Sequence, residues 1–460
     1  MRKKILIINP PIYTKGKIGF DMLVRPRPPL TLAIIQAILK KDYNSSLLDA
    51  SALAYRPEKT IKLILTKKPQ ILILTSSPLD RWQTPNLFLD SVFSIINEAK
   101  KDNPQIKVIL TGTHGTLTPK WVFDNCQVDY VVHGEPELTV KELVKLITAD
   151  KEINKVKGIS FKKGVKVVTN SPRPALKELD SLPFPAYEDL PLHKYCYTSN
   201  DLATPFTTVL SSRGCPFSCV FCLRAMMALP YRVRSPKNVA KELLLLQKKF
   251  KVRSVFFQDW EFTIDKKRVE KICQLIKKNK IRIKWGCNAR ATDLSLNLVK
   301  VMKKAGCVRI NIGFETGSQK LLKSADKRIM VDDLEKAINI CHELKINIGI
   351  YLLINLPGET EETLKETAKV LVKNKIDDNF WWNYPIPYIG TELFRQDKRL
   401  KNKTWPELSA WAGKVGTEMK TDTARKLLNR FIWQEKYGRL YFLNPSFYNI
   451  VGRWFQSLVQ

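Results

Sequence analysis

The 460-residue sequence predicts an α/β protein with two successive strand–helix units followed by a helical C-terminal region. Short apolar runs alternate with amphipathic segments over residues 1–150, and the same alternation returns over residues 206–390. Between them, residues 151–205 are punctuated by prolines, which is typical of a linker that wraps around its neighbours. Residues 391–460 lack the alternation and are rich in basic and aromatic side chains.

The first unit has the pattern of a doubly wound parallel sheet. Its predicted strands are the apolar runs at 4–9, 45–50, 71–77, 107–112 and 129–134. Its predicted helices lie at 30–41, 87–101 and 138–147. Ligands of such sheets bind at the carboxyl ends of the strands. These ends carry small and polar residues, which suit a large polar ligand: NPP (9–11), SSP (76–78), GTHGT (112–116) and HGEPE (133–137).

The second unit contains six consecutive strand–helix repeats. Its predicted strands lie at 206–212, 254–259, 283–290, 309–315, 347–355 and 379–386. Its predicted helices lie at 239–250, 269–279, 296–306, 334–345 and 363–374. Six such repeats predict a partial, TIM-like (β/α)6 barrel, whose chemistry lies at the carboxyl ends of the strands. We therefore expect one mouth to hold Cys215, Asp259, Glu261, Arg290, Glu315 and Asn355.

A CxxxCxxC motif, formed by Cys215, Cys219 and Cys222, follows the first barrel strand. Three thiolates hold three irons of a four-iron cluster and leave the fourth iron open to chelate a small molecule. A zinc site needs further Cys or His nearby, and a ferredoxin needs a fourth cysteine. The other six of the nine cysteines are scattered, which argues against a disulfide framework and favours small core residues.

This motif, with Phe221 before its last cysteine, resembles that of the radical S-adenosylmethionine (SAM) enzymes. The resemblance implies a 4Fe–4S cluster that reductively cleaves chelated SAM to a 5′-deoxyadenosyl radical. It implies that Asp259 or Glu261 holds the methionine ammonium. The family pattern also implies Arg290 near the methionine carboxylate, Glu315 at the ribose or ammonium, and the segment of Asn355 along the adenine.

Residues 1–150 resemble the Rossmann-like cobalamin-binding domain of cobalamin-dependent radical SAM enzymes, through PPLTLAIIQAIL (28–39), LLDA (47–50), GTHGTLTP (112–119) and VDYVVHGEPELTVKEL (128–143). Many cobalamin proteins use an Asp-x-His-x-x-Gly motif, but no Asp precedes His114 by two positions. The resemblance therefore implies cobalamin held without a lower histidine ligand, and favours a hydrogen-bonding role for His114. The cofactor contacts it implies are Ser76, Ser77, Gly112, Thr113, His114, Gly134 and Glu135.

For the whole chain, the resemblance implies methylation of an unactivated carbon of a small molecule or lipid, with flavodoxin or ferredoxin as electron donor. Cyclisation or rearrangement without methyl transfer is the alternative within the family. The net charge of +33 suggests RNA modification as a third alternative. Relatives that methylthiolate transfer RNA carry a cysteine set in their first domain, whereas residues 1–150 contain only Cys126, so we do not expect nucleic acid as a partner.

The location and the C-terminal tail are predicted from apolar patterning. No apolar run approaches about 18 residues, and MRKKILIINPP reads as a first strand rather than a signal peptide, so we expect a cytoplasmic protein. A helical cover over the open end of the barrel is the simpler interpretation of residues 391–460. A peripheral contact with the inner membrane surface or with a greasy substrate is the alternative, suggested by aromatics such as Trp405, Trp411, Trp433, Phe442 and Trp454.

Overall fold

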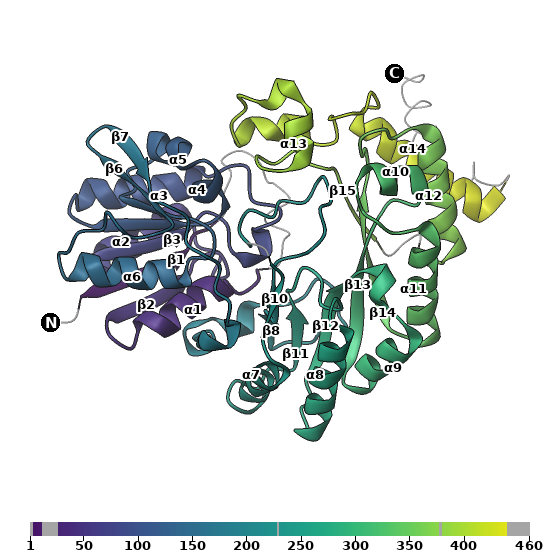
Figure 1. Ribbon diagram of the computed structural model, residues 1–460, viewed down its shortest axis with the longest axis horizontal. Coiled ribbons are helices and arrows are strands. Elements are labelled where there is room, and N and C mark those ends of the chain that lie inside the picture. The colour runs from purple at the N-terminus through teal and green to yellow at the C-terminus, as the bar shows by residue number, and fades with distance from the viewer. Residues whose placement is uncertain (1–2, 12–25, 228–229, 377–379, 439–460) are drawn as a thin grey trace, which may run out of the picture.

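The computed structural model describes residues 3–11, 26–227, 230–376 and 380–438. Two α/β units lie side by side, and the segment that carries α13 (Glu392–Gln396) reaches back from the second unit toward the first (Figure 1). The predicted order, a doubly wound domain and then a partial barrel, is confirmed.

The first sheet has seven strands in the order β2-β1-β3-β4-β5-β6-β7. Strands β1 to β5 pair in parallel, and β6 and β7 add an antiparallel edge. The strands are β1 (Lys4–Asn9), β2 (Asn44–Asp49), β3 (Ile71–Thr75), β4 (Lys107–Thr111), β5 (Tyr130–Val132), β6 (Ile159–Lys163) and β7 (Lys166–Thr169). The helices are α1 (Leu30–Leu39), α2 (Pro57–Lys67), α3 (Asp90–Asp102), α4 (Thr113–Leu117), α5 (Pro119–Asn125) and α6 (Glu137–Thr148).

Helices cover both faces of this sheet, which explains why the parallel strands are continuously apolar. Every residue of β3, with the sequence ILILT, is buried. Ile73 points into the core under α1 and α6, and its neighbour Leu72 points into the core under α2, α3 and α5. The small and polar strand ends are therefore left at the edge that faces the second unit (Figure 1).

Residues 151–205 do not act as a linker throughout, and this expectation is wrong for residues 159–169. These residues form the β6–β7 hairpin, which extends the first sheet. Gly164 supplies the left-handed φ of +62° at the tight turn. The rest of the stretch contacts both units: Asp189 accepts from Gln36 of α1 at 3.0 Å, and the Tyr187 hydroxyl donates to Glu242 of the barrel at 2.8 Å.

The second sheet has six parallel strands in the order β15-β14-β13-β12-β11-β8, an open barrel wall. The strands are β8 (Phe206–Val209), β11 (Ser254–Phe257), β12 (Lys284–Ala289), β13 (Cys307–Glu315), β14 (Asn347–Leu353) and β15 (Phe380–Asn383). The outer helices are α7 (Pro236–Lys248), α8 (Lys266–Lys278), α9 (Leu296–Lys304), α10 (Gln319–Ser324), α11 (Val331–Glu343) and α12 (Glu361–Lys373). A short antiparallel pair, β9 (Ser212–Arg213) and β10 (Arg232–Val233), brackets the cysteine loop.

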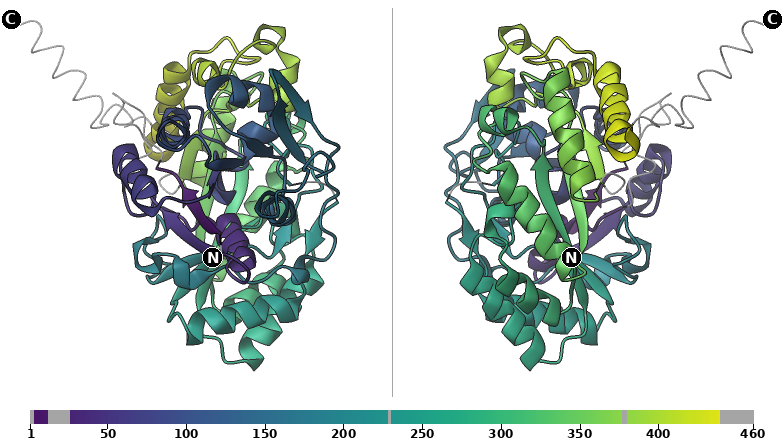
Figure 2. Two further views of the ribbon diagram at one scale, coloured as in Figure 1. Left: turned by 90° about the vertical axis from the view of Figure 1, so that its left-hand side faces the viewer. Right: turned by 90° about the vertical axis from the view of Figure 1, so that its right-hand side faces the viewer.

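The described part of the C-terminal region covers the barrel and the join between the units. Helix α14 (Thr421–Tyr437) packs along α12 (Figure 2). Trp405 is fully buried, and with Leu393 and Leu408 it packs against Leu223 of the cysteine loop. No helix in the described residues is long and apolar enough to cross a membrane. Residues 439–460, with Phe442 and Trp454, lie outside the described residues.

Candidate active site between the two units

The cysteine loop starts at Gly214, whose left-handed φ of +86° turns the chain out of β9. The Cys222 backbone N–H donates to the Cys219 carbonyl at 3.1 Å, which folds the motif into a tight turn. The pKa of the Cys215 thiol is raised to about 11, chiefly by burial. A backbone hydrogen bond with Phe217 lowers this pKa, and the charges of Glu261 and Cys219 raise it further. Burial likewise raises the pKa of the Cys222 thiol, and Cys219 and Cys215 raise it further. The three thiols therefore share one electrostatic environment.

A second loop, residues 325–328, supports the cysteine loop. The Val220 N–H donates to the Ala325 carbonyl at 3.1 Å, as one strand would pair with another. The Arg328 guanidinium donates to the Ser218 hydroxyl at 3.0 Å. The motif is thus held by contacts with a segment about 100 residues later in the chain.

Arg290 fixes both loops from the end of β12. Its guanidinium lies 3.7 Å from the centre of the Phe217 ring and donates to the Arg328 carbonyl at 3.0 Å. The side chain is buried, and its charge also lies near Cys219. Arg290 thus lies beside the cysteine loop, and its place near the methionine carboxylate stays a prediction.

The two acids that follow β11 have different surroundings. Asp259 is fully buried and accepts from the Ser211 backbone at 3.2 Å and the Ser211 hydroxyl at 2.9 Å, with a further bond from Ser212. It therefore fixes the entry to the cysteine loop. Glu261 Oε2 is shielded from solvent and has no hydrogen-bond partner among the described residues. Burial raises the pKa of Glu261 to about 7, while the nearby Lys327 and Arg290 charges lower it.

Glu315 ends β13 in a left-handed conformation with a φ of +63°, next to an irregularity in the strand pairing. A non-glycine residue held there stores backbone strain and points its side chain away from the regular strand direction. Its carboxylate pairs with Lys327 at 2.8 Å, and both side chains are buried. Lys327 is not among the residues predicted from the sequence: nothing in SADKR (324–328) distinguishes it from a surface lysine.

Asn355 lies beyond β14 and contacts the C-terminal region. It is fully buried with a φ of +65°, and its amide donates to the carbonyls of Gly413 at 3.0 Å and Met419 at 2.7 Å. Its Oδ1 atom is buried without a partner in the described part of the chain. The side chain therefore retains one acceptor for a ligand.

These residues fit a 4Fe–4S cluster with one open iron. Three thiols are grouped on one loop, and the charge of Glu261 acts on the Cys215 thiol. Glu261 also has the carboxylate oxygen without a partner among the described residues. Across the described ranges, no three His, Cys, Asp or Glu side chains converge on a single metal ion. A cubane does not require such convergence, because each thiolate binds its own iron.

The carboxyl ends of β3 and β4 form the second half of the site. A Cβ at Gly112, where φ is +111°, would lie 2.6 Å from Ser76 Oγ and 2.9 Å from the Ser77 nitrogen. The Thr113 N–H donates to Ser77 Oγ at 2.8 Å, and Ser77 Oγ donates to Thr113 Oγ1 at 2.8 Å. A narrow adjoining pocket is lined by Gly112, Pro136 and Trp82. Small residues and hydroxyls of this kind fit the polar tail of a cobalamin.

His114 has both ring nitrogens engaged. Nδ1 lies 3.0 Å from Ser76 Oγ and Nε2 lies 2.8 Å from the Asn86 carbonyl oxygen. The ring is fully buried and meets Trp405 edge-on at 4.5 Å. Burial lowers the pKa of His114 to about 4, so the imidazole is neutral at physiological pH. The side chain links Ser76 to Asn86 beside the carboxyl ends of β3 and β4. Neither ring nitrogen is free for a metal.

We therefore expect no histidine nitrogen on cobalt. Reconstituted enzyme with Co(II)-cobalamin should give the same electron paramagnetic resonance (EPR) spectrum whether the protein carries ¹⁴N- or ¹⁵N-histidine. The control is a protein with a known histidine ligand, whose spectrum changes with the label. A label-dependent splitting in the present protein would contradict the role given to His114.

Gly134 and Glu135 follow β5 at the boundary between the units. The Gly134 N–H donates to Thr116 Oγ1 at 2.9 Å, and Gly134 has a left-handed φ of +62°. Glu135 accepts from Arg213 Nη1 at 2.9 Å and from Arg232 Nη1 at 3.1 Å. These arginines lie on β9 and β10, at the two ends of the cysteine loop. The carboxylate of Glu135 is thus occupied in fixing that loop to the first unit.

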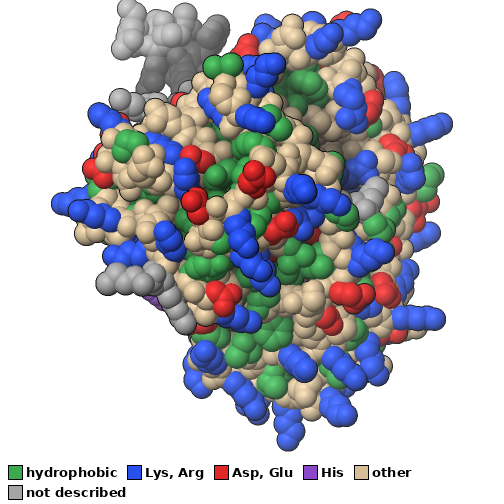
Figure 3. All heavy atoms as spheres, turned by 60° about the vertical axis from the view of Figure 1, so that its left-hand side comes forward, with side chains coloured by type: hydrophobic (Ala, Val, Ile, Leu, Met, Phe, Trp, Pro, Cys, Tyr) green, Lys and Arg blue, Asp and Glu red, His purple; other side chains and the backbone are tan. Residues whose placement is uncertain are grey.

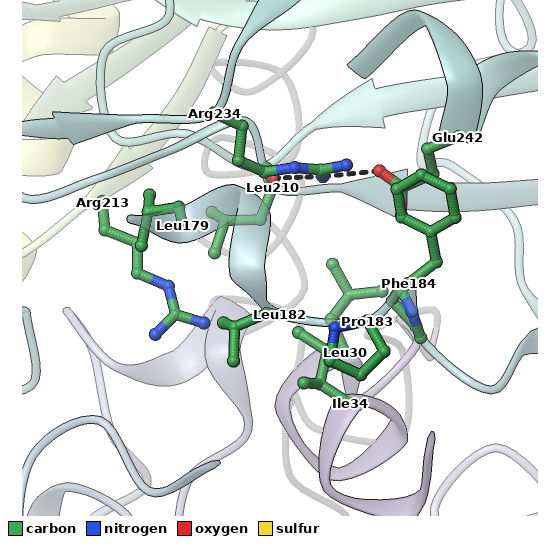
Figure 4. A pocket seen from close by; sticks show the side chains of 11 residues that line it. Leu30, Ile34, Leu179, Leu182, Pro183, Phe184, Leu210, Arg213, Arg234 and Glu242 are labelled. Atoms are coloured by element: carbon green, nitrogen blue, oxygen red, sulfur yellow. Dashed lines mark hydrogen bonds and ion pairs between the residues drawn. The ribbon is translucent and has the colours of Figure 1, made fainter. Parts of the chain in front are cut away.

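A small pocket lies where α1, the wrapping segment and the barrel meet (Figure 4). Leu30 and Ile34 come from α1, and Leu182 and Phe184 from the wrapping segment. Its charged groups are paired with each other or with neighbours: Arg234 with Glu242, and Arg213 with Glu137. We assign it no part in the reaction.

The chain matches two families, each over one unit. Residues 22–144 match the B12 binding domain, and residues 209–371 match the Radical SAM superfamily. An uncharacterized methyltransferase of Pyrococcus horikoshii, PH0819, is 30% identical over 393 residues, which are 85% of this chain and 82% of that protein. The anaerobic magnesium-protoporphyrin IX monomethyl ester cyclase of Rubrivivax gelatinosus is 27% identical over 402 residues, 85% of this chain and 70% of the cyclase.

A solved structure has the same fold. The radical SAM methyltransferase TsrM from Kitasatospora setae, with cobalamin and a [4Fe–4S] cluster bound, matches with a TM-score of 0.69 and 16% identity. The match covers 86% of this chain and 78% of TsrM. The chain belongs to the radical SAM enzymes that carry a B12-binding domain. Its cofactors are those that define this family: a 4Fe–4S cluster, SAM and cobalamin.

Proposed function

We propose that this enzyme methylates an unactivated carbon of a small molecule or lipid. One observation carries the proposal: Glu135 and Glu137 of the first unit bind Arg213 and Arg232, which bracket the cysteine loop of the second. The unit that would bind cobalamin and the loop that would bind the cluster are thereby joined through one buried group of ion pairs. This arrangement suits a reaction that uses both cofactors on one substrate. The similarity to a protein named as a methyltransferase supports it.

When bound, the cluster and SAM supply one-electron chemistry at an unactivated carbon, and cobalamin supplies a transferable methyl group. The chain's residues bind and orient these groups. Cys215, Cys219 and Cys222 would hold three irons, and Glu261 would accept from the methionine amino group at the open iron. Asn355 Oδ1 offers an acceptor for the adenine end, with Phe221 beside the last thiol.

Glu261 and Asp259 are distinguished by their partners, which gives a direct mutational test. Glu261→Gln removes the charge from the unpartnered oxygen, so we expect SAM binding to weaken by about 1.5–3 kcal/mol with the cluster intact. Asp259→Asn breaks the contacts with Ser211 and Ser212, so it should lower thermal stability instead. Equilibrium dialysis with reconstituted protein measures the affinity. Weakened SAM binding by Asp259→Asn with no effect of Glu261→Gln would contradict the proposed role of Glu261.

The reaction type is tested with SAM that carries a CD₃ group. Holoenzyme, a reductant and an extract of small molecules and lipids should yield a compound that gains CD₃, together with S-adenosylhomocysteine and 5′-deoxyadenosine. The alternative is a cyclase or rearrangement enzyme, which the similarity to a protein named as a cyclase supports. Such an enzyme would form 5′-deoxyadenosine with no labelled product. That result would reject methyl transfer.

The partners remain part of the proposal. A one-electron donor of the flavodoxin or ferredoxin class would reduce the cluster. Trp405 of the C-terminal region is buried against Leu223, which supports a covering role for this region over a membrane contact. Lys and Arg side chains are scattered over the face in Figure 3 and do not gather into one stripe, which supports a solvated basic surface over an RNA site.

A further inference from the structure

We propose that the buried Lys327 ammonium sets the reduction potential of the cluster, stabilising its reduced state. This inference rests on the proposed function, because it requires a cluster on Cys215, Cys219 and Cys222. The relevant step adds one electron from a low-potential reductant to the cluster, with no bond formed or broken.

The position of Lys327 is unusual for a lysine. Its side chain is only 6% exposed, and its ammonium pairs with Glu315 at 2.8 Å. Burial disfavours the ammonium, but the Glu315, Cys219 and Glu261 charges outweigh this effect and raise the pKa of Lys327. Ala325, two residues before Lys327, accepts from the Val220 N–H of the cysteine loop at 3.1 Å. The buried Lys327 ammonium is thus held on a loop that pairs with the ligand loop.

The surroundings hold the ammonium in place. A Cβ at Gly313 would lie 2.6 Å from Lys327 Nζ and 2.9 Å from Glu315 Oε1, so the ion pair occupies space that a side chain would fill. Arg290 donates to the Lys327 carbonyl, which fixes the backbone of the lysine. The Lys327 ammonium therefore has little freedom to move away from the thiols when their charge changes.

Charge balance gives the direction of the effect. Three thiolates and a 4Fe–4S core of charge +2 sum to −1, and one added electron makes the sum −2. A fixed positive charge in a poorly solvated site stabilises the more negative state. The Glu315 carboxylate opposes this effect, so the net field at the loop depends on both members of the pair. Removing the ammonium should lower the potential, and removing the carboxylate should raise it.

The test is an EPR-monitored redox titration of the reconstituted cluster without SAM. We expect Lys327→Met to lower the equilibrium constant for reduction at least tenfold, which is about 59 mV for one electron. Lys327→Arg should restore the potential, and Glu315→Gln should shift it upward. Lys323→Met removes an exposed lysine of the neighbouring helix α10 and should leave the potential unchanged.

Opposite shifts in the Lys327 and Glu315 variants would support the charge effect, because a merely structural role has no reason to change sign. An unchanged potential in Lys327→Met with an intact cluster would overturn it. If Lys327→Met fails to assemble a cluster, Glu315→Gln decides, and no upward shift overturns the inference. Wild-type protein that holds no cluster would instead reject the proposed function.

Discussion

Cys219→Ala should reduce SAM cleavage to the level of the reductant mixture without protein. Cys219 is the middle cysteine of the motif, and its removal leaves two thiols of the three on the loop. A cubane held by two thiolates has two unprotected irons, so cluster loss or conversion is expected. The measurement is formation of 5′-deoxyadenosine by anaerobically reconstituted enzyme, with iron and sulfide content determined on the same sample.

A matched control is Cys196→Ala, which removes a partly buried cysteine of the wrapping segment. It should retain both the cluster and the activity. The Cys219 variant should still bind cobalamin, because the first unit has its own core and does not contain the motif. Retained SAM cleavage by Cys219→Ala would contradict the ligand assignment.

Glu137→Ala should cost about 3–5 kcal/mol of the free energy of unfolding, because it leaves Arg213 buried with an incomplete set of partners. Arg213 and Glu137 are each 3% exposed, and Arg213 Nη1 also lies 3.2 Å from Glu137 Oε2. Arg213 directly precedes the turn into Cys215, so its displacement should also disturb the cysteine loop. Urea unfolding measures the first effect, and iron content after reconstitution measures the second.

The surface pair of Lys120 and Asp124 gives the control. Lys120 Nζ lies 2.7 Å from Asp124 Oδ2, so this pair is also in direct contact. Its side chains, however, are 79% and 51% exposed. Asp124→Ala should therefore change stability by less than about 1 kcal/mol. Equal losses in the two variants would contradict a special role for the interunit pair. The double variant Glu137→Ala, Arg213→Met should recover much of the loss, because no unpaired charge stays buried.

The sheets were predictable because their strands carry strong local signals. The run ILIL of β3 is continuously apolar, and a helical pattern follows each of the first five barrel strands. The β6–β7 hairpin was not predicted, because two short strands with charged ends give only a weak signal next to the prolines that begin at Pro172. Its stability comes from pairing with β5, a contact that depends on the folded sheet.

The site was predictable where a residue's role follows from a local motif. The cysteines lie on one loop as their spacing predicts. The partners of Asp259 and Glu261 were not predictable, since two acids two residues apart differ only in what the fold brings to them. Lys327 and Arg213 were missed for the same reason: Glu315 is 12 residues from Lys327, and Glu137 is 76 residues from Arg213. Such ion pairs are created by tertiary contacts.

We expect one iron of the cluster to have no protein ligand and to chelate SAM. Electron–nuclear double resonance on the reduced enzyme, with SAM labelled by ¹⁵N in its amino group and ¹⁷O in its carboxylate, tests it most directly. We predict hyperfine coupling to both labels, and loss of this coupling when SAM is omitted. A reduced cluster that shows neither coupling in the presence of saturating SAM would contradict it.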